Sequence, residues 1–592
     1  MGERRNLFRS QINGSSGWLL KAVYLPINRS LSSGAWCPWV FSGLALLAYT
    51  WLTPLRDLYG LEARNGLIAR EMLEGGLSLI PKVLDRPYLD YPPLYFWLET
   101  LFSWPFGHVC TFSAVFPSAL AASGLAALSY YLGREISYYA GWLTAIILAT
   151  SPEFWLKGSR ATIDMLLAFE VTLSIFFLYQ RYKEERPVRR RWYILGAALA
   201  MISAFFTKGP IGMALPVAIW SGYLTFERRW QDLKYFILAM VSLSLICLGT
   251  ELAMLWHQGG MDLVREVIES QVTGRLGKVP NRSIFYYPCY LLRSAGPWWL
   301  WGIAAAVSCL GLKQYATGSR GLRGLVPQHP VIRLALVWFF VVFVIFSLAS
   351  SRHGRYLLPL FPSLAILISV AVDRLLKARP LKYSKVLTLI LHGLFVFLFL
   401  AGWGIFLFYP ISHVVSLKWL LAWSIAMLLG WVLIQIFFSR DFRMVTLTGL
   451  VLATGLSGAA LVVEPALSRQ ESGRLFVEAA ESMIENDVPI VLYKIHPDRN
   501  GVKYALYSRR VPEELHFCSS PEDLEQVKKP FMLLGRGRNL KGFGVFLKKN
   551  RARKLIKGSI HRREMVAYSV EPKSFVTSRR QQHNFCCYET IS

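Results

Sequence analysis

Few side chains in this chain of 592 residues are charged, and acidic ones are scarcer than basic ones. Charged residues make up only 17% of the chain and hydrophobic residues 54%, a balance that excludes a soluble globular protein. The 37 acidic residues face 65 Lys and Arg, which gives a formal net charge of +28. Residues 1–30 also lack the apolar core and cleavage site of a signal peptide, so we expect the first apolar segment to act as the targeting signal.

Cysteine is also scarce, and its spacing fits neither a disulfide framework nor a zinc site. No other residues form a ligand motif, so the sequence indicates no cofactor and leaves a divalent metal open. The eight cysteines are scattered along the chain at Cys37, Cys110, Cys247, Cys289, Cys309, Cys518, Cys586 and Cys587.

Long apolar runs are what the chain has in abundance. A helix needs about 20 apolar residues to cross a hydrocarbon core of about 30 Å, and such runs recur between residues 37 and 463. The segment 92–107 is the weakest candidate, because it is short, opens with Pro92 and Pro93 and contains Glu99, which favours an interfacial position. The other thirteen runs are 37–54, 114–132, 138–156, 163–180, 192–207, 210–226, 235–257, 294–312, 332–350, 356–372, 386–409, 417–438 and 444–463.

Five short connections between these runs are basic and should lie in the cytoplasm together with the N-terminus. Thirteen spans place all five on that side, whereas fourteen would put one of them outside. The basic connections are 181–191, 227–234, 313–323, 373–385 and 439–443.

The expected fold class is therefore a polytopic α-helical membrane protein with about 13 transmembrane helices and a small α/β domain. We divide it into a cytoplasmic overhang (1–36), a membrane domain (37–463) and an extracytoplasmic basic domain (464–592), with external loops at 55–112 and 258–293. In the last part, 488–495, 502–508 and 529–536 have the pattern of short strands and 466–485 that of an amphipathic helix. Between Lys528 and Arg580, 16 Lys or Arg face two acids, which suits an anionic acceptor or a phospholipid surface.

Ionisable residues collect at the external ends of the spans, where function is expected. Asp164 heads the span 163–180, four residues after Arg160; a dipole-stabilised carboxylate paired with that arginine is the alternative. Lys208 stands between two spans, where a snorkelling anchor is the alternative. Arg352, His353 and Arg355 precede another span and suit a phosphate or lipid headgroups.

The stretch "YGLEARNGLIAREMLEGG" (59–76) has the amphipathic pattern of an interfacial helix. Its carboxylate Glu62 is placed to act as a general base, and its arginines to hold phosphate. A surface helix with solvated charges is the alternative.

Six stretches together resemble the C-type polytopic glycosyltransferases that use polyprenyl-phosphate sugars. The resemblance is closest to the branch with the lipid A aminoarabinose transferases and the dolichyl-phosphate-mannose protein mannosyltransferases, and it covers about residues 37–375. The stretches, in family order, are "LEARNGLIAREMLEGG", "RPYLDYPPLYFWL", "SRATIDMLLAF", "FFTKGPIGMALP", "YYPCYLLRSAGPWWLWGI" and "RYLLPLFPSLAIL".

The resemblance implies transfer of a sugar on the outer face, with an acidic residue of the first external loop acting on the acceptor. The family has Asp immediately before the Glu of that loop, where this chain has Leu61, and often Lys before "PPL", where it has Tyr91. By position, the resemblance assigns catalysis to Glu62 and Asp164, with Asp57 as a substitute. For the donor phosphate, the resemblance and the external positions together indicate Arg64, Tyr91, Arg160, Lys208, Arg352, His353, Arg355 and Tyr356.

The sequence thus predicts an integral-membrane glycosyltransferase that moves a sugar from a polyprenyl-phosphate donor to an extracytoplasmic acceptor, lipid A or a cell-envelope glycan. A protein O-mannosyltransferase and a non-catalytic transporter of lipid-linked sugars are the alternatives. We expect a monomer in the bacterial inner membrane that contacts membrane lipids, has its active site toward the periplasm and binds no nucleic acid.

Overall fold

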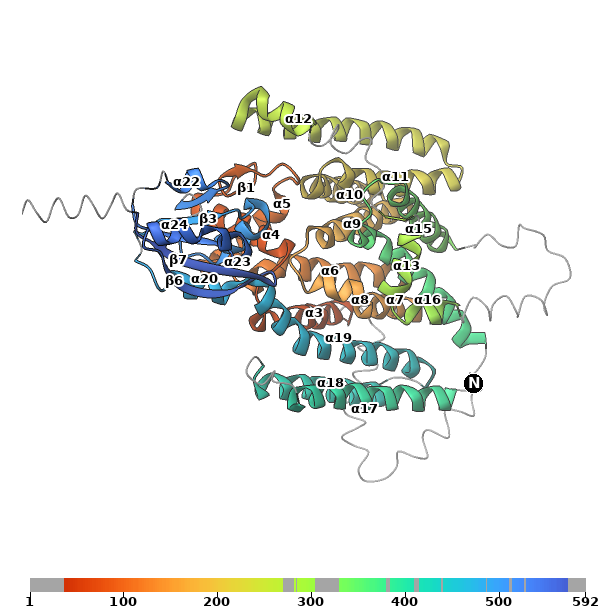
Figure 1. Ribbon diagram of the computed structural model, residues 1–592. Coiled ribbons are helices and arrows are strands. Elements are labelled where there is room, and N and C mark those ends of the chain that lie inside the picture. The colour runs from red at the N-terminus through yellow and green to blue at the C-terminus, as the bar shows by residue number, and fades with distance from the viewer. Residues whose placement is uncertain are drawn as a thin grey trace, which may run out of the picture.

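Long helices lie side by side in the computed structural model, and a small sheet covers one end of them (Figure 1). The structure describes residues 37–269, 282–283, 285–303, 329–378, 384–408, 415–437, 440–485, 487–510, 514–525, 527 and 529–572. The predicted overhang 1–36, the basic connection 313–323, the end of the predicted span 294–312 and the loop segment 270–281 therefore lie outside the described residues.

The long helices coincide with the predicted spans. Within the described residues, eight helices are long and apolar enough to cross a membrane, and two shorter helices are also apolar. A total of thirteen stays a prediction. The helices are α3 (Cys37–Thr50), α6 (Thr111–Arg134), α7 (Tyr138–Thr150), α9 (Ile163–Lys183), α10 (Pro187–Lys208), α11 (Pro210–Phe226), α12 (Trp230–Ile268), α15 (Pro330–Leu348), α16 (Phe361–Ala378), α17 (Ser384–Phe408), α18 (Leu417–Phe437) and α19 (Arg440–Ser472).

The helices differ in how much of their apolar surface the protein itself covers. In α6 and α9, 72% of the most apolar 18-residue stretch is buried inside the protein, whereas in α12 only 6% of that stretch is buried. Leu238, Leu245 and Ile246 on α12 are exposed. Exposure of these apolar side chains is unfavourable in water and costs nothing in lipid. The pattern is that of a helix bundle in which α12 lies at the periphery, as Figure 1 shows at the top of the view.

The predicted external loop 55–112 is folded. It contains α4 (Leu61–Gly75), a hairpin of β1 (Lys82–Val83) and β2 (Arg86–Pro87), and α5 (Leu94–Ser103). At 10 residues, α5 is about 15 Å long, too short to cross a hydrocarbon core of about 30 Å. This length agrees with leaving 92–107 out of the spans.

A five-stranded sheet forms the core of the C-terminal part, in the order β4-β3-β5-β7-β6. The strands β4, β3 and β5 are parallel to one another. β7 is antiparallel to β5, and the edge strand β6 is antiparallel to β7. Inward-facing residues such as Leu492, Leu534 and Ala567 are fully buried. The bounds are β3 (Ile490–Tyr493), β4 (Leu515–Cys518), β5 (Phe531–Arg536), β6 (Arg553–Ile560) and β7 (Arg563–Val570).

The structure corrects three sequence predictions in this part. Residues 502–508, predicted as a strand, contain the helix α21 (Val502–Tyr507). The predicted boundary at residue 464 falls inside α19, which continues to Ser472. The predicted helix 466–485 is broken at Gly473, whose φ of 77° ends α19 before α20 (Arg474–Glu481), because a left-handed residue cannot continue a right-handed helix.

The sheet-containing part is joined to the first external loop through Arg70 of α4. Its Nη1 donates to the carbonyl oxygens of Ala505 at 2.9 Å, Leu506 at 3.3 Å and Ser508 at 2.6 Å. Its Nη2 donates to that of Arg510 at 3.2 Å. One side chain thereby satisfies the carbonyls at the end of α21. The loop and the C-terminal part form one structure over the same end of the helices (Figure 1).

Candidate active site

A polar cavity of about 280 Å³ opens at the end of the helices that faces the sheet. Its walls come from four segments far apart in the sequence: the start of α4, the connection between β2 and α5, the connection between α8 (Pro152–Gly158) and α9, and the residue Arg355. The lining residues that carry charge are Glu62, Arg64, Asp90, Lys157, Arg160, Asp164 and Arg355.

Asp164 is the centre of a charged cluster at the first turn of α9. Lys208 donates to its Oδ1, and Nε of Arg355 lies 3.2 Å from its Oδ2. The side chains of Asp164 and Lys208 are only 9% and 8% exposed, so two cations balance one buried carboxylate. Lys208 reaches this point because α10 stops there, at Gly209 with a φ of 72°, and Pro210 starts α11.

Glu62 lies in the cavity wall with both carboxylate oxygens occupied. Arg56 binds it through two hydrogen bonds of 2.8 Å, and the backbone N–H of Ala161 donates to its Oε1 at 2.8 Å. Its side chain is 4% exposed. Such a bidentate pair is among the strongest that a carboxylate forms, and it links the first external loop to the segment that precedes Asp164.

Arg160 belongs to a second network that the sequence did not indicate. Its Nη2 donates to Oε1 of Glu464 at 2.5 Å and to the hydroxyl of Tyr59, which donates to Oε2 of the same glutamate at 2.9 Å. Glu464 lies on α19, 304 residues from Arg160 in sequence. The only sequence signal was a carboxylate directly after the last apolar run.

The connection after β2 supplies the aromatic wall of the cavity and one more carboxylate. Asp90 is 59% exposed, and its Oδ2 lies 3.9 Å from Nη1 of Arg64. Burial, followed by the charge of Asp90, raises the pKa of Tyr88 to about 12. Burial and the charge of Asp164 likewise raise the pKa of Tyr91 above its usual value, so both phenols keep their protons as hydrogen-bond donors.

Three of the predicted site residues lie around Arg355 outside the cavity wall. Tyr356 packs against the cluster, with Nζ of Lys208 4.5 Å from its ring centre. The ring of His353 lies 5.2 Å from that of Tyr356, and burial and the charge of Arg355 lower the pKa of His353. Arg352 donates to the carbonyl oxygens of Arg282 at 2.6 Å and Ser347 at 2.9 Å, contacts that hold the backbone.

Asp57, the predicted substitute for Glu62, faces a different cavity. It accepts from the hydroxyl of Ser472 at 2.9 Å and lies 3.4 Å from Nη1 of Arg474. Both partners belong to the junction of α19 and α20. Asp57 therefore does not line the cavity that contains Asp164 and Glu62.

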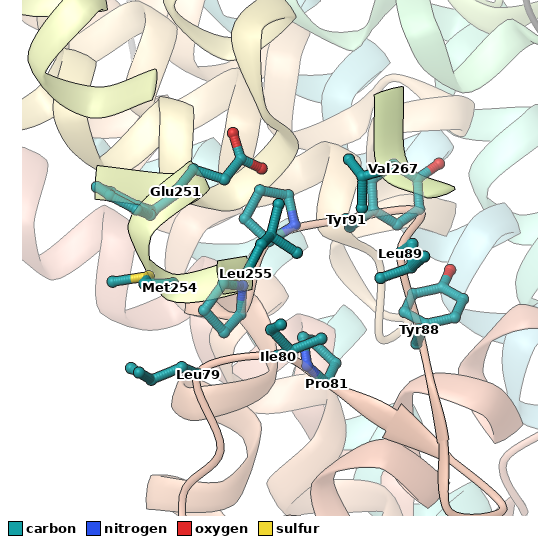
Figure 2. Close-up of a pocket in the computed structure, with 13 residues that line it drawn as sticks. Leu79, Ile80, Pro81, Tyr88, Leu89, Tyr91, Glu251, Met254, Leu255 and Val267 are labelled. Atoms are coloured by element: carbon teal, nitrogen blue, oxygen red, sulfur yellow. The ribbon is translucent and has the colours of Figure 1, made fainter. Parts of the chain in front are cut away.

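An apolar cavity adjoins the polar one, and Tyr88 and Tyr91 line both. Figure 2 shows Glu251, Met254 and Leu255 of α12 around this cavity, together with Leu79, Ile80 and Pro81 of the first external loop. The polar cavity thus borders an apolar surface on the side of α12.

A metal site is not evident in the part of the chain that the structure describes, since no group of three or more His, Cys, Asp or Glu residues is arranged to hold an ion. Four cations, Arg64, Lys157, Arg160 and Arg355, line the polar cavity.

Comparison with known proteins gives a consistent result. A family model described as dolichyl-phosphate-mannose-protein mannosyltransferase matches residues 90–253. The undecaprenyl phosphate-alpha-4-amino-4-deoxy-L-arabinose arabinosyl transferase of Edwardsiella ictaluri is 30% identical over 357 residues, which are 58% of this chain and 61% of that protein. The protein of the same name from Pseudomonas aeruginosa (strain LESB58) is 28% identical over 56% of this chain and 60% of its own.

The crystal structure of ArnT from Cupriavidus metallidurans bound to undecaprenyl phosphate superposes with a TM-score of 0.67, at 20% identity, over 90% of this chain and 98% of that one. The chain has the fold of ArnT. The family resemblance predicted from the sequence is confirmed. The matches to the two sequence relatives span about 61% and 60% of their length, so their activity does not carry over by identity alone.

Proposed function

We propose that this protein is an integral-membrane glycosyltransferase that moves a sugar from a polyprenyl phosphate to an extracytoplasmic acceptor, lipid A or a cell-envelope glycan. The observation that carries the proposal is the cluster of Asp164, Lys208 and Arg355 at a cavity in a chain with the ArnT fold. The names of its relatives, arabinosyl transferases with an undecaprenyl-phosphate donor, support the same class of substrate.

The donor phosphate would lie against the cationic side of the cavity. Arg355 and Lys157 line it, and Lys208 stands behind Arg355 on the shared carboxylate of Asp164. As the sugar leaves, negative charge develops on the lipid phosphate, and cations already fixed in place stabilise that charge without rearranging. Tyr91 keeps its proton and can donate a hydrogen bond to the same phosphate in place of the usual lysine.

The prenyl chain would extend along the apolar surface that adjoins the polar cavity. Leu79, Ile80 and Leu255 belong to that surface, and α12 beside it exposes further apolar side chains. A donor with a charged head and an apolar tail therefore meets matching surfaces on the two sides of Tyr88 and Tyr91.

The thirteen spans, the extracytoplasmic C-terminal domain and the site facing the periplasm of a bacterial inner membrane are part of this proposal. The basic connections 181–191 and 227–234 lie at the opposite ends of the helices from α4 and the sheet in Figure 1. Because basic connections favour the cytoplasmic side, this arrangement supports a site on the extracytoplasmic side.

The test is transfer of labelled sugar from undecaprenyl phosphate to purified lipid A by the purified protein. Asp164→Asn should reduce transfer by about 100-fold, because it removes the charge that holds Lys208 and Arg355 in place. Asp232→Asn is the matched control, since Asp232 pairs with the exposed Arg229 at the other end of the helices and should leave transfer unchanged.

Two other outcomes would redirect the proposal. Transfer to a hydroxyl-containing peptide but not to lipid A would make the protein an O-mannosyltransferase, which the family match at 90–253 favours. Donor binding with no transfer to any acceptor, indifferent to Asp164→Asn, would make it a transporter of lipid-linked sugars.

A further inference from the structure

The cavity presents three carboxylates, and they differ sharply in their availability for proton transfer. The side chains of Glu62 and Asp164 are 4% and 9% exposed, whereas that of Asp90 is 59% exposed. A general base must reach the acceptor proton within hydrogen-bond distance, so an acceptor entering from solvent meets Asp90 first.

Glu62 and Asp164 are also neutralised by their partners. Arg56 takes both oxygens of Glu62, and Ala161 adds a backbone N–H. Lys208 and Arg355 each take one oxygen of Asp164. An acceptor hydroxyl would have to displace one of these partners before it could donate a hydrogen bond to either carboxylate.

Asp90 has looser partners on a firmly held connection. Arg64 stays 3.9 Å away, and the phenol of Tyr88 lies beside it. The hairpin that leads to Asp90 is held from α4, because the backbone N–H of Leu84 donates to Oε1 of Glu71 at 2.8 Å. The cations Lys157 and Arg355 line the same cavity, so one space offers a phosphate site and an accessible carboxylate.

We propose that Asp90 is the residue that activates the acceptor, and that Glu62 holds the site together through Arg56 and Ala161. The proposal rests on the proposed function. The family resemblance gives acceptor activation to an aspartate at the position of Leu61. The proposal gives it instead to Asp90, in a different segment of the same external loop.

In the step, an acceptor hydroxyl oxygen attacks the anomeric carbon of the donor, and its proton moves to the carboxylate of Asp90. A new glycosidic C–O bond forms as the C–O bond between the sugar and the lipid phosphate breaks. The electron pair leaves with the polyprenyl phosphate, and Lys157 and Arg355 stabilise the negative charge that develops on that phosphate. Asp90 then returns the proton to solvent, to which it is open.

The experiment compares Asp90→Asn with Asp85→Asn in the transfer assay. Asp85 is the matched control, because it is also 59% exposed and in the same hairpin, but it pairs with Lys82 and does not line the cavity. Asp90→Asn should lower kcat by about 100-fold or more, with donor binding and the thermal midpoint unchanged. Asp90→Glu should keep part of the activity, and Asp85→Asn all of it.

A second readout separates catalysis from structure. The wild-type rate should fall on the acid side of its pH profile as the base is protonated, and the residual rate of Asp90→Asn should not. Glu62→Gln should lower the thermal midpoint, because it leaves the guanidinium of Arg56 buried without its full partner.

Transfer by Asp90→Asn within about 3-fold of wild type would overturn the inference and leave the proposed function standing. The same holds if Glu62→Gln abolishes transfer at an unchanged thermal midpoint, because Glu62 would then be the base. A wild-type protein that transfers nothing would overturn both the proposed function and the inference.

Discussion

Leu61 occupies the one position of the cavity where the residue type departs most from what the family resemblance implies. It is the first residue of α4, it lines the cavity, and it is 49% exposed. A leucine cannot take a proton, yet the surrounding walls are those of a charged site. At this position the departure is a single side chain, so one substitution can reverse it.

We predict that Leu61→Asp restores transfer to the Asp90→Asn variant, at least 10-fold above that variant alone. The new carboxylate would enter the same cavity, and at the first turn of α4 it is favoured by the helix dipole by about 0.3–1 kcal/mol. Transfer of labelled sugar measures the result. Leu77→Asp is the control, because Leu77 is 67% exposed and lines no part of this cavity; equal rescue by both would argue against a local effect.

Single residues were predictable where the sequence itself marks them. Asp164, Lys208 and Arg355 each stand out as a charge at the end of an apolar run, and the structure brings the three together. Their neighbours could not be found in this way. Glu464 contacts Arg160 across 304 residues of sequence. Asp90 is distinguished from the other carboxylates of the cavity by its exposure, which the sequence does not indicate.

At the scale of elements, the hairpin β1–β2 depends on a carboxyl group of the neighbouring helix. Burial raises the pKa of Glu71 from 4.5 to about 7, although hydrogen bonds from the backbone of Leu84 and Asp85 favour the charged form. Between these two values the folded protein retains a proton that the unfolded chain has lost. The free energy of unfolding therefore falls as the pH rises through this window.

We predict that Glu71→Gln removes this part of the pH dependence. Gln keeps the acceptor for Leu84 and cannot ionise, so the variant should match wild type near pH 4.5 and exceed its thermal midpoint above about pH 7. Glu74→Gln, on the same helix but 42% exposed and paired with Arg70, is the control. Parallel midpoint curves for wild type and Glu71→Gln from about pH 4.5 to about pH 8 would contradict the prediction.

Helices of the bundle were predictable because an apolar run of this length has few other stable forms in a membrane. Short elements were not. Residues 502–508 alternate as a strand would, but Val502, Tyr504, Ala505 and Leu506 are all buried as a helix between α4 and the sheet. The packing around a segment of this length outweighs its own pattern, since a period of two and a period near four are hard to distinguish over one or two turns.

At the scale of the whole molecule, the C-terminal part carries a basic surface. Arg536, Arg538, Lys541 and Arg563 line a hollow of about 390 Å³ there, with Glu564 as the acid among its lining residues. A surface of one sign concentrates ligands of the opposite sign near it. An anionic acceptor is therefore expected to bind faster because of this surface, without being held by it during the reaction.

We predict that Arg538→Glu combined with Lys541→Glu raises the KM for lipid A by about 10-fold at low salt, with kcat unchanged. The difference should shrink at high salt, because exposed charges are screened over about 10 Å at 0.1 M. Arg189→Glu combined with Arg190→Glu is the control, since both lie in the basic connection predicted to be cytoplasmic. A KM that rises equally in both pairs would contradict steering by this surface.

Arg70 carries a consequence for building hybrids of this protein with its relatives. Its guanidinium belongs to the first external loop, but the carbonyls that it satisfies belong to a segment more than 400 residues later in the chain. Exchange of the C-terminal part alone would place that guanidinium against a surface from another protein. Exchange of the loop alone would leave four carbonyl oxygens without their hydrogen-bond donor. A hybrid therefore has to exchange the first external loop and the C-terminal part together.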